Sequence, residues 1–302
     1  MENSRVPPLF NFCWNQADFN GEFNKGLVTI VAIDQQNRMH AIGTGFIILG
    51  GGHTATCVTA AHVFSEIRKL QSSPTRHSAS TLQEFLPLPK EIELNTNKVI
   101  AFGLDGARVG VARVNGYMFN EQSDIAVFNI TLQDLSHPSF FDTEFVLSER
   151  TPEVGDLISI LSFDRMSVST REETKPESAS FEVQRRVILR AGRVLAYYPN
   201  GHRLCKGPCV ETSIPVYSGM SGGPVFHYSD ITSQIKPFGI VCSDPDIDDE
   251  KKQDRSIEGR SVVALLPCDV SSNDRGERVT KLSMNIEPIS NLGGLFKPPA
   301  IC

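Results

Sequence analysis

Short runs of apolar and β-branched residues recur along the chain, and glycine, proline and asparagine interrupt them. Runs of this length and composition are typical of β-strands. The expected strands cover residues 27–33, 41–49, 54–59, 98–102, 107–114, 124–130, 157–163, 186–197, 223–226, 238–242 and 261–266. Helical spacing is sparse, so we expect a helix only over residues 61–70 and in a short segment near residues 82–86. The pattern predicts an all-β protein.

The expected strands form two groups of similar size, separated by a polar, proline-containing stretch at about residues 132–152. We expect each group to close into a six-stranded antiparallel barrel, because closure removes the exposed edges of a sheet. Asp105 and Gly106 form a hairpin signal between two strands of the first group. Three polar, turn-rich segments are longer than most connections in compact domains, and we expect surface loops there. These segments cover residues 71–90, 164–180 and 244–260.

The composition is that of an ordinary globular protein. The chain has 302 residues, of which 40% are hydrophobic, and this is too apolar for a disordered protein. The 29 Lys and Arg against 35 Asp and Glu give 29 − 35 = −6, which excludes a basic nucleic-acid binder that depends on neutralising phosphates. No apolar run reaches the roughly 18 residues of a membrane-spanning helix. We therefore expect neither nucleic acid nor a membrane among the partners.

The cysteines and the N-terminus indicate the compartment. Seven cysteines are scattered along the chain, unlike the dense, even set of a secreted disulfide scaffold. Residues 1–8 lack the basic start and apolar run of a secretory signal. A reducing compartment, and hence a cytoplasmic location, is the expectation.

The stretch from Tyr217 to Val225 carries the strongest chemical motif. It reads Tyr-Ser-Gly-Met-Ser-Gly-Gly-Pro-Val, and a Gly-x-Ser-Gly-Gly string is expected by chance only about 0.01 times in such a chain. Glycines on both sides permit a tight turn that exposes the Ser221 hydroxyl and aims successive amides at one point. A serine nucleophile with an oxyanion hole requires this arrangement.

A serine nucleophile needs a base and the base needs an orienting carboxylate. His62 is the best candidate among the histidines, because Val-Thr-Ala-Ala-His places it directly after an apolar strand. Asp124 opens another strand, whose apolar remainder would bury it. The order along the chain is therefore His62, Asp124, Ser221.

Thr-Ala-Ala-His, Asp-Ile-Ala and Gly-x-Ser-Gly-Gly-Pro in this order resemble the motifs of chymotrypsin-like (trypsin-fold) serine peptidases. The resemblance runs from about Gly43 to Val241, and Val-Gly-Asp at residues 154–156 is similar to the intracellular, HtrA-like branch that lacks disulfides. It implies two β-barrels with the active site in the cleft between them. It also implies these roles: Ser221 as nucleophile, His62 as general base and acid, Asp124 as buried orienter, Gly219 and Ser221 as oxyanion-hole amides, and Cys242, Ser243 and Asp244 as the strand that pairs with substrate.

Three departures from the family pattern bear on regulation. Val63 follows the histidine and Tyr217 lies four residues before the serine, where secreted members have cysteines, so those two disulfides cannot form. Met220 stands where zymogen-activated members have an aspartate that pairs with a newly cleaved N-terminus. Activation by that ion pair is excluded, and we expect control by loop ordering or by a regulatory protein partner.

Some features have a structural as well as a functional interpretation. Taken singly, the glycine-rich loop could be a tight turn, His62 a core histidine and Asp124 a cap, but their joint occurrence in family order favours catalysis. His202, Cys205 and Cys209 could supply three zinc ligands, although a fourth is not evident. The favoured interpretation is that these residues have a structural role and bind no metal. Cys57 and Cys242 are expected to be small buried hydrophobic residues.

Side-chain preference stays open. Pro215 lies six residues before the nucleophile, where the trypsin branch has an aspartate at the base of the specificity pocket. Arg260 could favour an acidic substrate group, whereas the acidic loop over residues 244–250 could attract basic ones or be merely solvated.

The sequence thus predicts a serine endopeptidase that acts on proteins or peptides through an acyl-enzyme, without a cofactor. Two alternatives remain open, an inactive trypsin-fold module that binds peptides and an esterase-type acyl hydrolase with the same triad. The expected parts are an N-terminal arm (1–26), a peptidase domain (27–268) made of a first barrel (27–135), a linker (136–153) and a second barrel (154–268), and a C-terminal tail (269–302).

Overall fold

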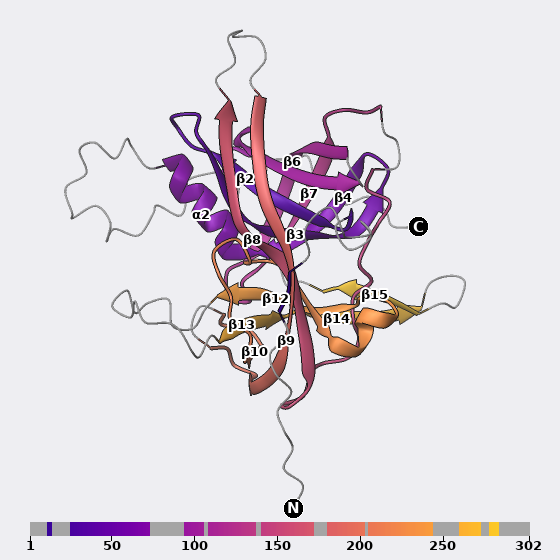
Figure 1. Ribbon diagram of the computed structural model, residues 1–302. Coiled ribbons are helices and arrows are strands. Elements are labelled where there is room, and N and C mark those ends of the chain that lie inside the picture. The colour runs from indigo at the N-terminus through magenta and orange to yellow at the C-terminus, as the bar shows by residue number, and fades with distance from the viewer. Residues whose placement is uncertain are drawn as a thin grey trace, which may run out of the picture.

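A computed structural model gives the architecture of the chain (Figure 1). It describes residues 11–13, 25–72, 94–105, 108–136, 140–171, 180–202, 205–243, 260–272 and 278–283. Within these ranges strands dominate, accompanied by a single α-helix, α2 (Ala61–Ser72), and the short 3₁₀ turns η2 (Thr96–Lys98) and η3 (Tyr228–Thr232). No helix in the described ranges is long and apolar enough to cross a membrane.

The first barrel consists of six antiparallel strands that close in the order β2-β3-β4-β7-β6-β5. They are β2 (Leu27–Ile33), β3 (Met39–Gly51), β4 (Thr54–Ala60), β5 (Val99–Asp105), β6 (Arg108–Asn120) and β7 (Ile125–Leu132). Val, Ile and Phe fill its interior, and Phe46 and Phe128 are among the largest fully buried side chains. Asp105 of β5 pairs with Arg108 of β6, which confirms the predicted hairpin.

The second barrel closes in the order β9-β10-β13-β12-β11-β8, because β8 also pairs with β9. Its strands are β8 (Leu157–Arg171), β9 (Ser180–Tyr198), β10 (Cys209–Thr212), β11 (Pro224–His227), β12 (Pro237–Ser243) and β13 (Ser261–Leu265). Two closed six-stranded antiparallel barrels confirm the predicted all-β, trypsin-like fold.

The hairpin of β8 and β9 is longer than the sequence indicated. The surface loop expected over residues 164–180 is wrong over its first half, because β8 continues to Arg171 and pairs with β9 down to Ser180. Polar residues such as Ser167 and Ser169 alternate there with Met166 and Val168, and this composition resembles that of a loop. Pairing with a partner strand nevertheless satisfies the backbone.

The extended hairpin rises along the first barrel in Figure 1 and contacts it. Arg185 of β9 donates from Nη1 to Thr29 Oγ1 (2.6 Å) and to the Phe102 carbonyl (3.2 Å), both in the first barrel. Its guanidinium also lies 4.3 Å from the ring centroid of Phe163. The hairpin therefore helps to fix the two barrels relative to one another.

Both predicted terminal segments contain strands. In the expected arm, β1 (Asn11–Cys13) pairs with β9. In the expected tail, β14 (Cys268–Ser272) and β15 (Arg278–Leu282) form a two-stranded sheet. The helical segment predicted near residues 82–86 lies outside the described residues, and the proposed domain limits stay predictions.

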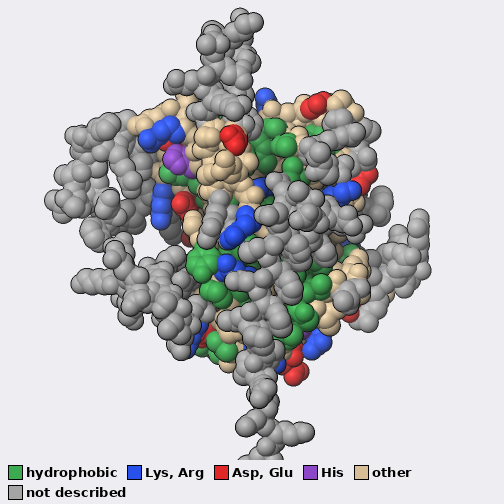
Figure 2. All heavy atoms as spheres, in the orientation of Figure 1, with side chains coloured by type: hydrophobic (Ala, Val, Ile, Leu, Met, Phe, Trp, Pro, Cys, Tyr) green, Lys and Arg blue, Asp and Glu red, His purple; other side chains and the backbone are tan. Residues whose placement is uncertain are grey.

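Described Lys and Arg side chains are interspersed with Asp and Glu on the face shown in Figure 2. No extended surface of one charge is visible among the coloured atoms of that face.

Candidate active site

His62 and Asp124 meet where β4 and β7 lie side by side. Ala60 ends β4 and pairs with Ile125 at the start of β7, so the residue that follows β4 and the one that precedes β7 are neighbours. The Ala61 amide donates to the Asp124 carbonyl (3.0 Å). The His62 amide donates to Asp124 Oδ1 and His62 Nδ1 bonds to Oδ2, both at 2.8 Å.

The Asp124 carboxylate is held in one orientation. The residue is only 4% exposed, as the sequence predicted, and its φ of 54° lies in the left-handed region, which Asp tolerates better than most residues. A carboxylate can only accept hydrogen bonds, so Nδ1 must carry the proton that it shares with Oδ2. The second ring nitrogen, Nε2, is then free to accept a proton.

Cys242 of β12 lies close enough to Asp124 for the carboxylate to affect its thiol. Burial, reinforced by the charge and hydrogen bond of Asp124 and partly offset by a hydrogen bond to Cys205, raises the pKa of the Cys242 thiol to about 12. The thiol is therefore protonated at neutral pH. Cys242 is fully buried, as is Cys57, which confirms the expectation that both pack as small apolar residues.

The nucleophile loop, residues 217–223, is a compact turn. The Met220 amide donates to the Tyr217 carbonyl at 3.0 Å, and Gly219 inside this turn has a φ of 93°, a conformation that glycine adopts without strain. Gly222 has a φ of 82° and its amide donates to Val241 at 2.8 Å. The glycines of the motif thus occur where the backbone requires them.

Three successive carbonyls of this loop point inward and are held across the interface between the barrels. Thr44 of β3 donates its hydroxyl to the Gly219 carbonyl (2.8 Å) and its amide to the Ser221 carbonyl (2.8 Å). Ser162 of β8 donates to the Met220 carbonyl (3.0 Å). In contrast, the amides of Gly219 and Ser221 donate to none of the described residues.

Ser221 lies next to the start of α2. A Cβ added to Gly43 would be 3.1 Å from the Ser221 carbonyl oxygen and 2.8 Å from Val63 Cγ2, so Gly43 separates the nucleophile loop from the residue after His62. Ser221 and His62 are both described, and no hydrogen bond joins their side chains. The structure therefore contains the hydrogen bond between His62 and Asp124 but none between the side chains of Ser221 and His62. Catalytic hydrogen bonds are often long or absent in enzyme structures without substrate.

The residues expected to bind substrate are only partly described. The Pro215 carbonyl accepts a hydrogen bond from Arg190 Nη1 at 2.7 Å. Ser243 is the last residue of β12, and its backbone is opposite Val262, while Asp244 and the acidic loop lie outside the described residues. Arg260, considered as a partner for acidic substrate groups, forms an ion pair with Glu211 at 3.0 Å.

His202, Cys205 and Cys209 are not arranged as zinc ligands in the structure. Among the described residues, no three His, Cys, Asp or Glu side chains are arranged to hold a metal ion. The His202 ring stacks on Tyr198 with a centroid distance of 4.2 Å, and Cys205 and Cys209 are buried free thiols.

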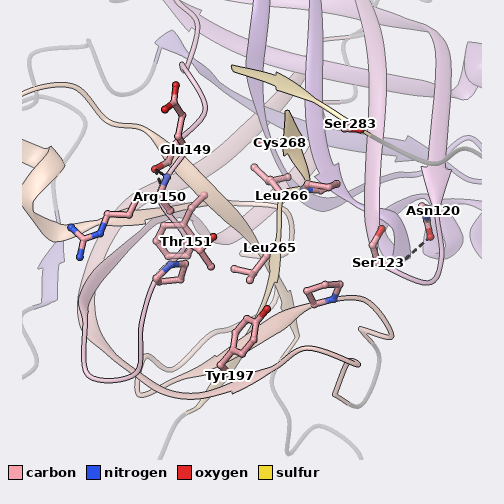
Figure 3. Close-up of a pocket in the computed structure, with 15 residues that line it drawn as sticks. Asn120, Ser123, Glu149, Arg150, Thr151, Tyr197, Leu265, Leu266, Cys268 and Ser283 are labelled. Carbon is pink, nitrogen blue, oxygen red and sulfur yellow. Dashed lines mark hydrogen bonds between the residues drawn. The ribbon is translucent and has the colours of Figure 1, made fainter. Parts of the chain in front are cut away.

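A cavity of about 390 Å³ lies beside the linker between the barrels (Figure 3). Arg150 and Thr151 of the linker, Ser123, and Leu265 of the second barrel are among its lining residues, whereas His62 and Ser221 do not line it. It is therefore separate from the candidate active site.

Sequence reasoning missed the contributions of Thr44 and Arg190. Thr44 lies in the Gly-Thr-Gly stretch at residues 43–45, which was considered only as part of the resemblance. The two flanking glycines were the one local signal for it. Arg190 carries no local motif, because its contacts are made more than twenty residues away in the sequence.

The sequence matches the profile of the trypsin-like peptidase domain over residues 43–230, more than half of the chain. The chain belongs to the trypsin-like peptidase family. The matched segment includes His62, Asp124 and Ser221, and family membership supports a serine peptidase. No curated protein matches the chain significantly.

Two solved structures are among those similar to this chain. One is Rv3671c from M. tuberculosis H37Rv, an inactive serine-to-alanine mutant, with 14% identity, coverage of 80% of this chain and 82% of that one, and a TM-score of 0.39. The other is the MamO protease domain from Magnetospirillum magneticum in its apo form, with 12% identity, coverage of 82% and 95%, and a TM-score of 0.40.

Proposed function

We propose that this member of the trypsin-like peptidase family is a serine endopeptidase. The observation that carries the proposal is the double hydrogen bond between His62 and Asp124, at 2.8 Å each, beside a loop in which the amides of Gly219 and Ser221 are available to a ligand. This arrangement suits acyl transfer, because the base is oriented and two donors await a developing negative charge.

The proposed mechanism is acyl transfer through Ser221. His62 Nε2 takes the proton of the Ser221 hydroxyl as its oxygen attacks the substrate carbonyl, and the Asp124 carboxylate stabilises the imidazolium that forms. The Gly219 and Ser221 amides donate to the oxyanion of the tetrahedral intermediate. His62 then protonates the leaving amine, and water hydrolyses the acyl-enzyme by the same sequence of steps.

The end of β12 is the proposed substrate-pairing edge. β11 begins at Pro224, opposite Ile240 of β12, so Cys242 and Ser243 extend beyond the start of their neighbouring strand. A substrate backbone can add there as an extra strand, and Asp244 would continue this edge. We include Pro215 in the specificity pocket as a part of the same proposal.

We also propose that the enzyme works in a reducing compartment, as the cysteine pattern and the N-terminal residues suggested, and is controlled by loop ordering or a protein partner. Five cysteines of the described ranges are free thiols: Cys57, Cys205, Cys209, Cys242 and Cys268. Free thiols are ordinary in a reducing compartment.

Covalent labelling by a fluorophosphonate probe tests the proposal. The wild-type chain should be labelled and Ser221→Ala should not, and a search for new protein termini in a treated lysate should find cleaved proteins. The open link between Ser221 and His62 favours the competing candidate, a peptide-binding module. If the chain is not labelled either with or without cell extract, the peptide-binding module is supported. If it is labelled and hydrolyses esters but cleaves no protein, an esterase is supported.

A further inference from the structure

The nucleophile loop needs a support at its outer end, where Tyr217 and Ser218 are exposed. Its inner end is fixed by Thr44 and Ser162, which bind the carbonyls of Gly219, Met220 and Ser221. The turn that places the Gly219 amide begins at the Tyr217 carbonyl, which accepts the Met220 amide at 3.0 Å. Whatever holds Tyr217 therefore also fixes the direction of the Gly219 amide.

Met220 supplies one part of this support without a charge. Its side chain is fully buried among apolar residues of the second barrel, and its sulfur accepts the Tyr217 amide at 3.3 Å. This packing anchors the far side of the turn but leaves the Tyr217 ring, 57% exposed as a residue, to be held otherwise.

Arg190 of β9 makes the contacts that hold this ring and the segment before it. Its Nη1 donates to the Pro215 carbonyl at 2.7 Å, and its guanidinium carbon lies 4.5 Å from the centroid of the Tyr217 ring. One planar group thus binds the chain at two points, two residues apart, immediately before the turn. The combination of a fixed fork of donors and a flat face that stacks on aromatic rings is particular to arginine.

The backbone that carries Arg190 is itself fixed. Arg190 pairs with Ile160 of β8 on one side and with Asn11 of β1 on the other. Its side chain is mostly shielded, since the residue is only 6% exposed. Shielding from water strengthens both the hydrogen bond and the cation–π contact.

We propose that Arg190 is a positioning residue for the oxyanion hole, acting through Pro215 and Tyr217 on the Gly219 amide. The inference rests on the proposed peptidase function, since it assigns Arg190 the task of keeping that amide aimed at the developing oxyanion. Without the guanidinium, the Tyr217–Met220 turn loses its outer support, and the Gly219 amide turns away in part of the molecules. Chemistry then slows, while substrate pairing along β12 is unchanged.

Arg193 offers a matched control on the same strand. Its Nη1 also donates to a backbone carbonyl at 2.7 Å, but that carbonyl belongs to Gly155, at the start of the second barrel. Removing Arg193 therefore deletes a similar hydrogen bond without touching the nucleophile loop.

The experiment compares the wild type with Arg190→Ala, Arg190→Lys and Arg193→Ala. The rate of fluorophosphonate labelling at Ser221 and, with a peptide substrate, kcat and KM are measured. Since loss of one oxyanion donor lowers turnover by about 10²–10³-fold, we expect labelling and kcat of Arg190→Ala to fall about 100-fold with KM nearly unchanged. Arg190→Lys should be intermediate, Arg193→Ala should stay within about twofold of wild type, and added methylguanidinium should partly restore Arg190→Ala.

Wild-type rates for Arg190→Ala, or an equal loss in Arg193→Ala, would overturn the assignment. If Arg190→Ala does not fold, the comparison of Arg190→Lys with the wild type decides. If the wild type itself is not labelled, the peptidase proposal fails separately, and hydrogen exchange at the Met220 amide then decides the inference. Faster exchange in Arg190→Lys than in Arg193→Ala supports the positioning role, and equal exchange contradicts it.

Discussion

His62 and Asp124 are joined twice, once through the histidine ring and once through the histidine backbone, with one carboxylate oxygen for each bond at 2.8 Å. The backbone bond prevents the carboxylate from rotating away when the ring moves. The same bond satisfies an amide in the first turn of α2, which has no partner within the helix. Orientation of the proposed base is thereby built into the start of the helix.

Asp124→Asn should leave the fold intact and remove the orientation of the base. An amide in place of the carboxylate has one acceptor, so it cannot satisfy both the His62 amide and Nδ1, and it stabilises the wrong ring tautomer. We expect kcat to fall ~10⁴-fold with little change in KM. The exposed Asp142 provides the control Asp142→Asn, which should match wild type. A loss smaller than tenfold would show that Asp124 does not orient the base.

Gly222→Ala should disorganise the nucleophile loop. An added Cβ would lie 2.1 Å from Thr59 Oγ1 and 2.2 Å from the Thr44 carbonyl oxygen, at a φ of 82°. The left-handed conformation alone costs about 1–2 kcal/mol for a residue with a Cβ, and the overlap with β3 and β4 adds to it.

Gly155→Ala separates these two effects, because Gly155 has a φ of 94° with nothing within 4 Å of an added Cβ. It should lower the free energy of unfolding by about 1–2 kcal/mol and preserve labelling of Ser221. Gly222→Ala should lose both stability and labelling. Equal behaviour of the two variants in denaturant titrations and labelling would contradict the steric account.

The two barrels could be predicted because most of their strands can be recognised from the local sequence alone. Runs such as 27–33 are almost wholly buried in the structure, and their apolar, β-branched composition marks them without knowledge of their partners. His62, Asp124 and Ser221 could be proposed as site residues as well, since each belongs to a short motif near a strand end. The contact between His62 and Asp124 was expected from the resemblance rather than from spacing, and the role of Ser221 stays a prediction.

What the sequence could not give is the set of contacts that join distant segments. Thr44 and Ser162 hold the nucleophile loop from two different barrels, and Arg190 reaches Pro215 and Tyr217 from β9. Such pairs depend on which surfaces meet when the barrels pack, and a lone Thr, Ser or Arg has many other uses. The polar part of the β8–β9 hairpin was missed for a related reason, because its strands are stabilised by pairing rather than by burial.

Cys242→Ala should weaken catalysis while Cys242→Ser should preserve it. The Cys242 thiol, whose pKa is raised to about 12 chiefly by burial, is protonated, and we expect it to donate to Asp124; serine supplies a donor of similar size. Hydrogen bonds to charged groups contribute about 1.5–3 kcal/mol, so we expect kcat of Cys242→Ala to fall roughly tenfold or more. Cys57→Ala removes an equally buried thiol from β4 and should affect stability only. Similar kcat for Cys242→Ala and Cys57→Ala would show that the thiol is not needed.

The loss of stability as the pH falls below about 4 should depend on Asp34, which caps the turn between β2 and β3. Its carboxylate accepts hydrogen bonds from the Gln36 and Arg38 amides, Arg38 Nε and His40 Nε2, at 2.8–3.0 Å. Burial opposes ionisation, but these bonds, led by that of His40, outweigh it and hold the pKa of Asp34 well below its usual range.

A lowered pKa in the folded state means that the ionised form stabilises the fold. This contribution is complete above the unfolded pKa of about 3.9 and is lost as the pH falls through the lower folded pKa. Asp34→Asn should therefore lower the free energy of unfolding by about 1–2 kcal/mol at neutral pH, and the deficit should shrink progressively below about pH 4. Urea titrations of both proteins from pH 7 to pH 2 measure the difference. A deficit that stays constant down to pH 2 would mean that the charge on Asp34 contributes nothing.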